Sequence, residues 1–416
     1  MPTSALSMTP PALSLPSPAV IALIGAPAAG KSTLAARHFQ PPEVLSGDFS
    51  PELGRRLARG ELSVIDAPLT RPDERRRVLE AARAHDLPAV ALVLDLPRQV
   101  LEDRAARLGR DPASVLPEFG ELRRTLGGLQ KEGFRQIHVL RSVAEVDAVQ
   151  IVRVPLPPDR RDLPGPFDVI GDVHGCLPEL LELLETLGYI VNGAEIRPPA
   201  GRTAVFLGDL TDRGPDSAGV LRVVMNMVTS GAALCVPGNH DEKLARALGG
   251  KAVRAMHGLE GTLAQLDAAG EDFKAGVRAF ISTLPSHLVL DAGRVVVAHA
   301  GLPTRYQGRT SGRVRSFALY GDVDGTYDEL GLPIRRDWAA DYRGEAIVVY
   351  GHTPVAAPRW VNRTVDIDTG CAFGGALTAL RYPELEFVSV SAHQQYVAPP
   401  RPLPLLGPED GTPELI

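Results

Sequence analysis

Five short polar clusters, each directly after an apolar run, constrain this chain more than any other feature. The clusters are Gly171-Asp-Val-His-Gly175, Gly208-Asp-Leu-Thr-Asp-Arg-Gly214, Gly238-Asn-His-Asp241, His299-Ala-Gly301 and Gly351-His-Thr353. We predict that the runs before them are β-strands, at Phe167–Ile170, Thr203–Leu207, Ala232–Val236, Val295–Ala298 and Ala346–Tyr350. Sites in α/β sheets form at the carboxyl ends of strands. The pattern therefore predicts one shared site.

The clusters supply a mixed set of oxygen and nitrogen ligands for metal ions: Asp172, His174, Asp209, Asn239, His299 and His352. Such a set suits Mn, Fe or Zn. Two ions about 3.5–4 Å apart can hold a phosphoryl group and activate water for in-line attack. Arg213 can bind phosphate oxygens in a bidentate manner. The clusters therefore predict a metal-binding site beside an arginine that can bind phosphate.

A second motif, Gly25-Ala-Pro-Ala-Ala-Gly-Lys-Ser32, matches the phosphate-binding P-loop. It follows a predicted strand at Ala19–Ile24 and begins a predicted helix at Ser32–His38, as the motif requires. Backbone N–H groups of such a loop surround the phosphates, while the lysine and hydroxyl contact phosphate and Mg²⁺. The candidate residues for binding ATP and Mg²⁺ are Gly25, Gly30, Lys31, Ser32 and Thr33.

A kinase also needs a base and cations over the γ-phosphate. Asp48 is the candidate base, although a turn cap explains it equally well. Asp66 ends a predicted strand at Leu62–Asp66, where it would contact a metal-bound water or cap a helix. Arg104, Arg107 and Arg110 recur every third residue on one helix face. They would form either a lid over the phosphates or a solvated stripe.

Proline-rich stretches divide the chain. We predict a disordered tail at 1–18, a P-loop kinase-like domain at 19–154, a linker at 155–166, a phosphatase domain at 167–397 and a second loose tail at 398–416. Further strands at Ala89–Leu94 and Gln136–Leu140 alternate with helical patterns at Asp73–His85 and Arg98–Leu108. This alternation indicates an α/β parallel sheet in the first domain.

Composition excludes several classes of protein. The net charge of −6 argues against a strongly basic nucleic-acid-binding chain. Three cysteines cannot form a disulfide framework, and no apolar run approaches the about 20 residues of a membrane span. The N-terminus carries no Lys or Arg before Lys31, so it lacks a signal peptide's basic start. We therefore expect a cytoplasmic protein with no membrane partner.

The order of the five clusters resembles that of the calcineurin-like metallophosphoesterases, whose fold is an αββα sandwich. The resemblance implies that Asp172 and His174 hold one metal, that Asn239, His299 and His352 hold the other, and that Asp209 bridges them. It also implies that His240 protonates the leaving group or steadies the transition state.

The two domains together resemble the bacterial polynucleotide kinase-phosphatases of RNA end repair. The resemblance rests on Gly128–Arg135, Val236–Leu244, Ile367–Gly375 and Leu377–Glu384. It implies a functional role for Asp368. It further implies 5′-OH phosphorylation with ATP and Mg²⁺, and removal of 3′-phosphate or 2′,3′-cyclic phosphate with Mn²⁺, or with Fe, Zn or Ni. The implied partners are RNA or DNA ends, a nucleotide, a separate ligase and a second copy in a homodimer.

The chain departs from that family in its kinase half. Pro51 stands where the family has an acceptor-binding arginine, and the helical segment expected next is largely missing because Leu62–Asp66 follows so early. The ligase module usual in the family is also not expected here. The alternative is a metallophosphoesterase, either a dinucleoside-polyphosphate hydrolase or a protein Ser/Thr phosphatase, with a degenerate nucleotide-binding P-loop module. The His299-Ala-Gly301 form is one that dinucleoside polyphosphatases share.

Overall fold

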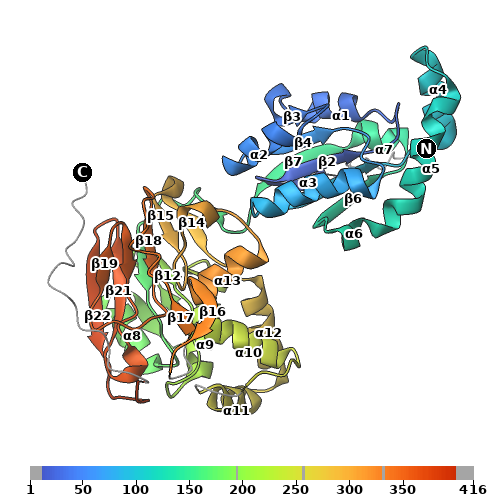
Figure 1. Ribbon diagram of the computed structural model, residues 1–416. Helices are drawn as coiled ribbons and strands as arrows, with labels where there is room; N and C mark the ends of the chain where they lie inside the picture. Colours follow the sequence, from blue (N-terminus) through green and yellow to red (C-terminus); the bar gives the residue numbers. More distant parts are fainter. Residues whose placement is uncertain (1–11, 194, 255–257, 330–332, 400–416) are drawn as a thin grey trace, which may run out of the picture. The chain divides into compact units, whose positions relative to one another are not determined.

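The computed structural model describes residues 12–193, 195–254, 258–329 and 333–399. The chain divides into two compact units, the first comprising residues 1–156 with 309–311 and the second the remainder. Figure 1 shows the elements of both units. Among the described residues, no helix is both long enough and apolar enough to cross a bilayer.

The first unit is built on a five-stranded parallel sheet, which confirms the predicted α/β P-loop fold. Its strand order is β3 (Val44–Leu45), β4 (Ser63–Asp66), β2 (Val20–Ile24), β5 (Ala89–Leu94) and β6 (Gln136–Leu140). The helices are α1 (Lys31–His38), α2 (Ser50–Ala58), α3 (Pro72–Ala84), α4 (Arg98–Arg107), α5 (Leu116–Thr125), α6 (Leu129–Glu132) and α7 (Val143–Ala148).

Successive residues of β2 face opposite sides of this sheet, and each side has its own buried hydrophobic cluster. Ile21 and Leu23 belong to one buried cluster with residues of α1 and α4, whereas Ala22 and Ile24 belong to another with residues of α2 and α3. Both faces are therefore covered by helices, as all-parallel sheets require. We expected the helical segment after Asp48 to be largely missing, but helix α2 lies there.

Two stretches expected to be loose are partly strands. Within the predicted tail at 1–18, β1 (Ala12–Ser17) pairs in parallel with β7 (Gln150–Pro155), because Leu15 is buried in the first unit's core. Residues 1–11 lie outside the described residues. Within the predicted linker, β8 (Asp159–Arg160) joins the edge of a sheet in the second unit. Most of the predicted C-terminal tail, residues 400–416, also lies outside the described residues.

The second unit contains two packed sheets. The five-stranded sheet has the order β13 (Ala233–Cys235), β12 (Thr203–Phe206), β9 (Phe167–Ile170), β21 (Ala376–Tyr382) and β22 (Glu386–Ser391). The six-stranded sheet has the order β19 (Arg359–Val361), β20 (Thr364–Asp366), β18 (Ile347–Tyr350), β15 (Val295–Val297), β14 (Leu288–Leu290) and β8. The helices are α8 (Leu177–Thr186), α9 (Ser217–Thr229), α10 (Asn239–Leu248), α11 (Leu259–Ala269), α12 (Glu271–Thr283) and α13 (Gly312–Tyr320).

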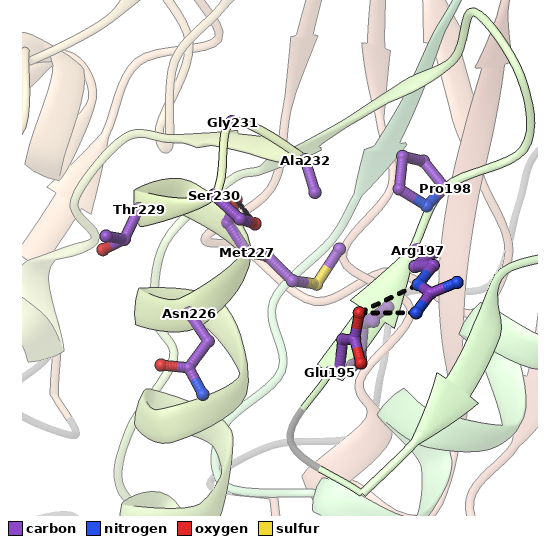
Figure 2. A pocket seen from close by; sticks show the side chains of 10 residues that line it. Glu195, Arg197, Pro198, Asn226, Met227, Thr229, Ser230, Gly231 and Ala232 are labelled. Atoms are coloured by element: carbon purple, nitrogen blue, oxygen red, sulfur yellow. Dashed lines mark hydrogen bonds and ion pairs between the residues drawn. The ribbon is translucent and has the colours of Figure 1, made fainter.

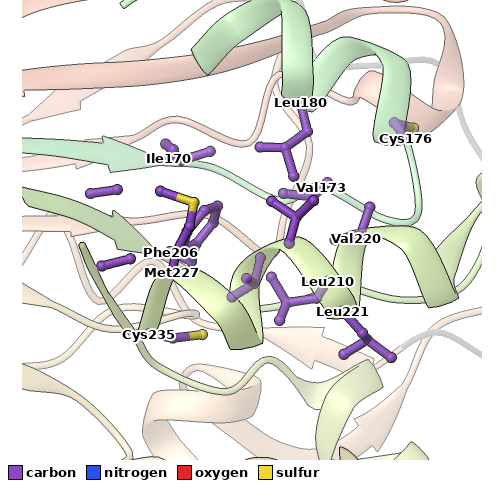
Figure 3. Packing of buried hydrophobic residues seen from close by; sticks show 14 of the residues in the cluster. Ile170, Val173, Cys176, Leu180, Phe206, Leu210, Val220, Leu221, Met227 and Cys235 are labelled. Carbon is purple, nitrogen blue, oxygen red and sulfur yellow. The ribbon is translucent and has the colours of Figure 1, made fainter. Parts of the chain in front are cut away.

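Successive side chains of a strand point to opposite faces of its sheet, and this alternation produces the layers of this unit. Val205 packs against the second sheet's Val295 and Val297, whereas the neighbouring Phe206 belongs to the cluster shared with helices α8 and α9. Figure 3 shows Phe206 and Leu180 in that helix-facing cluster. On the outer face of the second sheet, β15 and β18 pack against α13. The order helix, sheet, sheet, helix confirms the predicted αββα sandwich.

Candidate metal centre and P-loop site

The loops after five strands bring the six predicted metal ligands together. Asp209 Oδ2 lies 3.4 Å from His174 Nε2, and Asp209 Oδ1 lies 3.5 Å from His299 Nε2. His299 Nε2 is in turn 3.0 Å from Asn239 Oδ1 and 3.0 Å from His352 Nδ1. Asp172 joins this group because its Oδ2 accepts a hydrogen bond from the backbone N–H of His352 at 3.2 Å. The carboxylate of Asp209 therefore stands between two sets of ligands.

Outer contacts orient the imidazoles. Nδ1 of His174 lies 2.9 Å from the Thr211 carbonyl oxygen, and Nδ1 of His299 lies 3.2 Å from that of Leu207. Because Nδ1–H donates to a carbonyl, the lone pair of each ring is on Nε2, which faces Asp209. Burial lowers the pKa of both rings, and nearby Arg213 adds to this effect. Neutral imidazoles are the form that binds metals.

Two buried carboxylates at the centre, those of Asp172 and Asp368, each have an oxygen without a hydrogen-bond partner among the described residues. Burial, together with the neighbouring Asp368 and Asp209, raises the pKa of Asp172 well above its usual range. The oxygens concerned are Asp172 Oδ1 and Asp368 Oδ2. Buried charges are normally paired or coordinate metals. The donor set and these orphaned oxygens therefore fit divalent cations.

Two glycines allow the loops to approach this centre. A Cβ at Gly238 would lie 2.0 Å from Asp209 Oδ1, and one at Gly351 would lie 2.2 Å from Asp172 Oδ1. Strain is also concentrated here, since His174, Asp209 and His352 have φ angles of 48°, 45° and 75°. Left-handed backbone at non-glycine residues clusters at functional sites, where the surrounding structure holds it in place.

A proton donor and a phosphate-binding group lie beside the ligands. His240 Nδ1 is 2.7 Å from Asp212 Oδ2, so its Nε2 faces the centre, 4.0 Å from Asp209 Oδ2. Arg213 Nη2 lies 3.1 Å from His240 Nε2, and its guanidinium stacks on the Phe373 ring at 4.9 Å. The geometry thus gathers the predicted His240 and Arg213 with the metal ligands.

Comparison with known proteins agrees with this geometry. The family model described as calcineurin-like phosphoesterase matches residues 165–395, more than half of the chain. The chain belongs to the calcineurin-like phosphoesterases. This family membership implies divalent metals at the Asp and His cluster and supports metal-dependent phosphoester hydrolysis. A second model, described as an AAA domain, matches residues 49–118.

Curated relatives resemble the phosphoesterase part of the chain. The chain is 48% identical over 236 residues to "Bis(5'-nucleosyl)-tetraphosphatase PrpE [asymmetrical]" of Anoxybacillus flavithermus, covering 56% of this chain and 96% of the relative. It is 50% identical over 235 residues to the protein of the same name from Bacillus subtilis, covering 55% and 96%. These relatives do not carry the name polynucleotide kinase-phosphatase. The comparisons therefore support a phosphoesterase domain and a P-loop-type domain, but not the kinase-phosphatase activity specifically.

Some supporting residues were not identified from the sequence. Asp241 is fully buried and accepts hydrogen bonds from the backbone N–H groups of Leu210 and Gly238, at 3.0 and 2.9 Å. It therefore ties the Asp209 loop to the Asn239 loop. Thr262 on α11 donates to Asp212 Oδ1 at 2.7 Å and so helps to hold the partner of His240. Asp241 lies inside a motif, but nothing in the sequence indicates Thr262.

Asp368, whose role rested on resemblance alone, lies at the same centre. Its Oδ1 accepts from the Gly370 backbone N–H at 3.0 Å, and burial raises its pKa to about 6. A Cβ at Gly351 would lie 3.2 Å from Asp368 Cβ, which places this residue beside Asp172. The structure thus brings Asp368 to the metal ligands, while its chemical role stays a prediction.

The P-loop forms a separate site in the first unit. A cavity of about 450 Å³ is lined by Gly30, Lys31, Ser32 and Thr33 and by the three arginines predicted as a lid, Arg104, Arg107 and Arg110. Lys31 Nζ donates to the carbonyl oxygens of Gly25 and Ala26, at 2.7 and 3.1 Å. Arg104 Nη1 donates to the Ala29 carbonyl at 3.0 Å. Arg110 lies beyond the end of α4, so the three arginines do not share one helix face as expected, and their role as a lid stays a prediction.

The two acidic candidates are not part of this cavity's lining. Asp48 is exposed and pairs with Arg77 at 3.3 Å, which leaves the choice between base and turn cap open. Asp66 ends β4 and acts electrostatically on Lys31, raising the pKa of that lysine against the larger effect of burial. The structure therefore supports the phosphate cradle more strongly than it supports a catalytic base.

Nucleotide binding at the P-loop should depend on pH through Lys31. Burial lowers the pKa of Lys31 to about 8. A polyphosphate binds the protonated amine of Lys31. Above pH 8 this amine must take up a proton when ATP binds, and the affinity for ATP should therefore fall. We expect Lys31→Ala to weaken ATP binding at least tenfold at pH 7 and to flatten this decline, as measured by calorimetry. A variant at an exposed lysine, Lys251→Ala, should keep both the affinity and the decline. A decline unchanged in Lys31→Ala would contradict the assignment.

A second hollow in the phosphoesterase unit contains none of the predicted site residues. It has a volume of about 690 Å³ and lies between β11 (Glu195–Arg197) and the end of α9. Figure 2 shows its lining, in which Arg197 pairs with Glu195 at 2.8 Å. Both side chains are largely exposed, so this ion pair contributes little. We assign no chemistry to this hollow.

Proposed function

We propose that the phosphoesterase unit hydrolyses dinucleoside polyphosphates asymmetrically. The observation that carries the proposal is the 48–50% identity to tetraphosphatases over 96% of their length. A polyphosphate chain also suits the concentration of cationic and hydrogen-bonding groups at the centre. This function replaces polynucleotide end healing, the function that the resemblance to the kinase-phosphatases favoured, as our main interpretation.

Different residues have different roles in the proposed hydrolysis. Divalent cations held by Asp172, His174, Asp209, Asn239, His299 and His352 would supply Lewis-acid activation of the phosphoryl group and of water; we propose Mn²⁺. Arg213 would hold two phosphate oxygens in a bidentate contact. His240, oriented by Asp212, would give a proton to the leaving phosphate. The orientation of His240 comes from its 2.7 Å contact with Asp212.

Product analysis tests this proposal. With Mn²⁺, diadenosine tetraphosphate should give equal amounts of ATP and AMP, separated by ion-exchange chromatography. ADP as the sole product would show symmetrical cleavage and contradict the proposed position of attack. An absence of nucleotide products, with p-nitrophenyl phosphate still hydrolysed, would reject the substrate class. His174→Ala serves as the inactive control, since it removes one predicted ligand.

A second candidate function is favoured by the P-loop cavity with its three arginines. In this version the first unit phosphorylates 5′-OH ends of RNA or DNA with ATP and Mg²⁺, and the second removes 3′-phosphate or 2′,3′-cyclic phosphate. A separate ligase would then seal the ends. Transfer of label from γ-labelled ATP to a 5′-OH oligonucleotide, absent in Lys31→Ala, would support it. Binding of ATP without transfer would leave the P-loop as a nucleotide-binding module. A homodimer and a cytoplasmic location stay predictions.

A further inference from the structure

Two of the three buried cysteines lie close to a glutamate inside the phosphoesterase unit. Cys176 precedes α8, Glu179 lies in the first turn of this helix, and Cys371 begins the short helix η6 (Cys371–Phe373). Both sulfur atoms and a carboxylate oxygen lie within 4.8 Å of one another, and all three residues are at most 1% exposed. Figure 3 shows Cys176 with Leu180 in the helix-facing cluster. Segments far apart in the chain thus bring three potential metal ligands together.

Glu179 has a carboxylate oxygen that its surroundings leave unsatisfied. Its Oε1 accepts hydrogen bonds from the His393 backbone N–H at 2.8 Å and from the Tyr396 hydroxyl at 2.9 Å. Its Oε2 is buried and has no hydrogen-bond partner among the described residues. Buried carboxylates are normally paired with a positive charge or coordinate a metal. The unsatisfied oxygen therefore indicates a cation beside the two thiols.

The two thiols interact with each other close to this carboxylate. The hydrogen bond with Cys176, together with burial, raises the pKa of the Cys371 thiol. When thiols bind a metal, the cation takes the place of their protons, which are released to solvent. Two thiolates and one carboxylate supply three negative charges, and a divalent cation would neutralise most of this charge. One ion can therefore satisfy the whole cluster.

The sulfur atoms determine which cations suit the cluster. Thiolates favour soft and borderline ions such as Zn²⁺, whereas carboxylates suit Mn²⁺ and Mg²⁺. The six ligands predicted for the candidate metal centre are oxygen and nitrogen donors, with no sulfur among them. The two sets of ligands thus differ in their chemistry, although Cys176 lies only two residues from His174. The cluster could bind Zn²⁺ while the centre bound Mn²⁺.

We propose that Cys176, Glu179 and Cys371 form a separate structural site for a zinc-type cation. Cys176 directly follows the polar cluster at residues 171–175, and Cys371 lies three residues after Asp368. A cation bound to both sulfur atoms would therefore fix these two loops to each other beside the candidate metal centre. The site goes beyond the proposed hydrolysis and does not depend on the identity of the substrate.

Cobalt binding tests the site, because a thiolate ligand gives Co²⁺ an intense charge-transfer band in the near ultraviolet. The full-length protein is stripped of metal with a chelator and titrated with Co²⁺ under reducing conditions. The unmodified protein should develop the band, and Cys371→Ser should lose it. Glu179→Gln should weaken the Co²⁺ affinity at least about tenfold. Cys235→Ser, which removes the buried thiol outside the cluster, is the matched control and should keep the band.

X-ray absorption of the unmodified protein with Zn²⁺ gives a second measurement that needs no variant. Sulfur ligands should appear at about 2.3 Å from zinc, whereas nitrogen and oxygen ligands lie at about 2.0–2.2 Å. Absence of the cobalt band or of the sulfur shell in the unmodified protein would overturn the site, and so would a band unchanged in Cys371→Ser. If circular dichroism shows that Cys371→Ser does not fold, the sulfur shell of the unmodified protein decides.

Discussion

Replacement of Asp209 with asparagine is expected to lower kcat for p-nitrophenyl phosphate by about 10³-fold or more. The carboxylate lies 3.4 Å from His174 Nε2 and 3.5 Å from His299 Nε2, between the two predicted ligand sets. Lewis-acid stabilisation supplies several kcal/mol, and each 1.36 kcal/mol is tenfold in rate. The metal-to-protein ratio after dialysis should fall by about one, since the bridging charge is lost.

The asparagine variant should still fold. Asparagine tolerates the left-handed φ of 45° at this position, and its amide oxygen can still accept from the His240 backbone N–H. Circular dichroism should therefore match that of the unmodified protein. Asp272→Asn, at an exposed position in α12, is the matched control and should keep both metal and rate. Retention of more than a tenth of kcat in Asp209→Asn would contradict the bridging role.

His240→Ala is expected to lower kcat by about 10²- to 10⁴-fold while leaving the metal-to-protein ratio unchanged. The reason is that His240, held by Asp212, faces the centre as a proton donor rather than as a predicted ligand. A proton donor matters most when the leaving group is a poor one. The loss should therefore be larger for an alkyl phosphate such as glycerol 2-phosphate than for p-nitrophenyl phosphate.

Metal content decides between the two roles open to His240. This residue also lies within reach of a shared cation with His174 and Asp209. If the metal-to-protein ratio of His240→Ala falls as it does in Asp209→Asn, then His240 is a ligand and the proton-donor role is wrong. His393→Ala is the control, because that histidine lies at the surface against Glu182. It should change neither rate nor metal content.

The strands that carry the motifs could be predicted because each is a short buried apolar run that ends in a polar cluster. Ala89–Leu94, Gln136–Leu140 and Phe167–Ile170 have the predicted bounds. Strand β1 could not be predicted, since the prolines in and around it are typical of a loose tail and its partner β7 lies more than 130 residues away. Its stability comes from burial of Leu15, which no local pattern shows.

The site was predictable only as far as its motifs extend. The ligand residues recur with characteristic neighbours. No local signal identifies Thr262 on α11, which holds Asp212, or Arg335 in the strand Pro333–Arg335, which contacts His352. The motifs also report the chemistry of the metal centre rather than the substrate. This is why the resemblance correctly indicated a phosphoesterase, while the relatives carry the name tetraphosphatase and the substrate of this chain stays a proposal.

The origin of the ligands has a consequence for folding. Asn239 follows a strand of the five-stranded sheet, whereas His299 and His352 follow strands of the six-stranded sheet. A cation held by all three would cross-link the two halves of the sandwich, and it could bind only after the sheets had packed together. A ligand that binds only the native state increases the free energy of unfolding. The stability of the sandwich would therefore depend on the concentration of the cation.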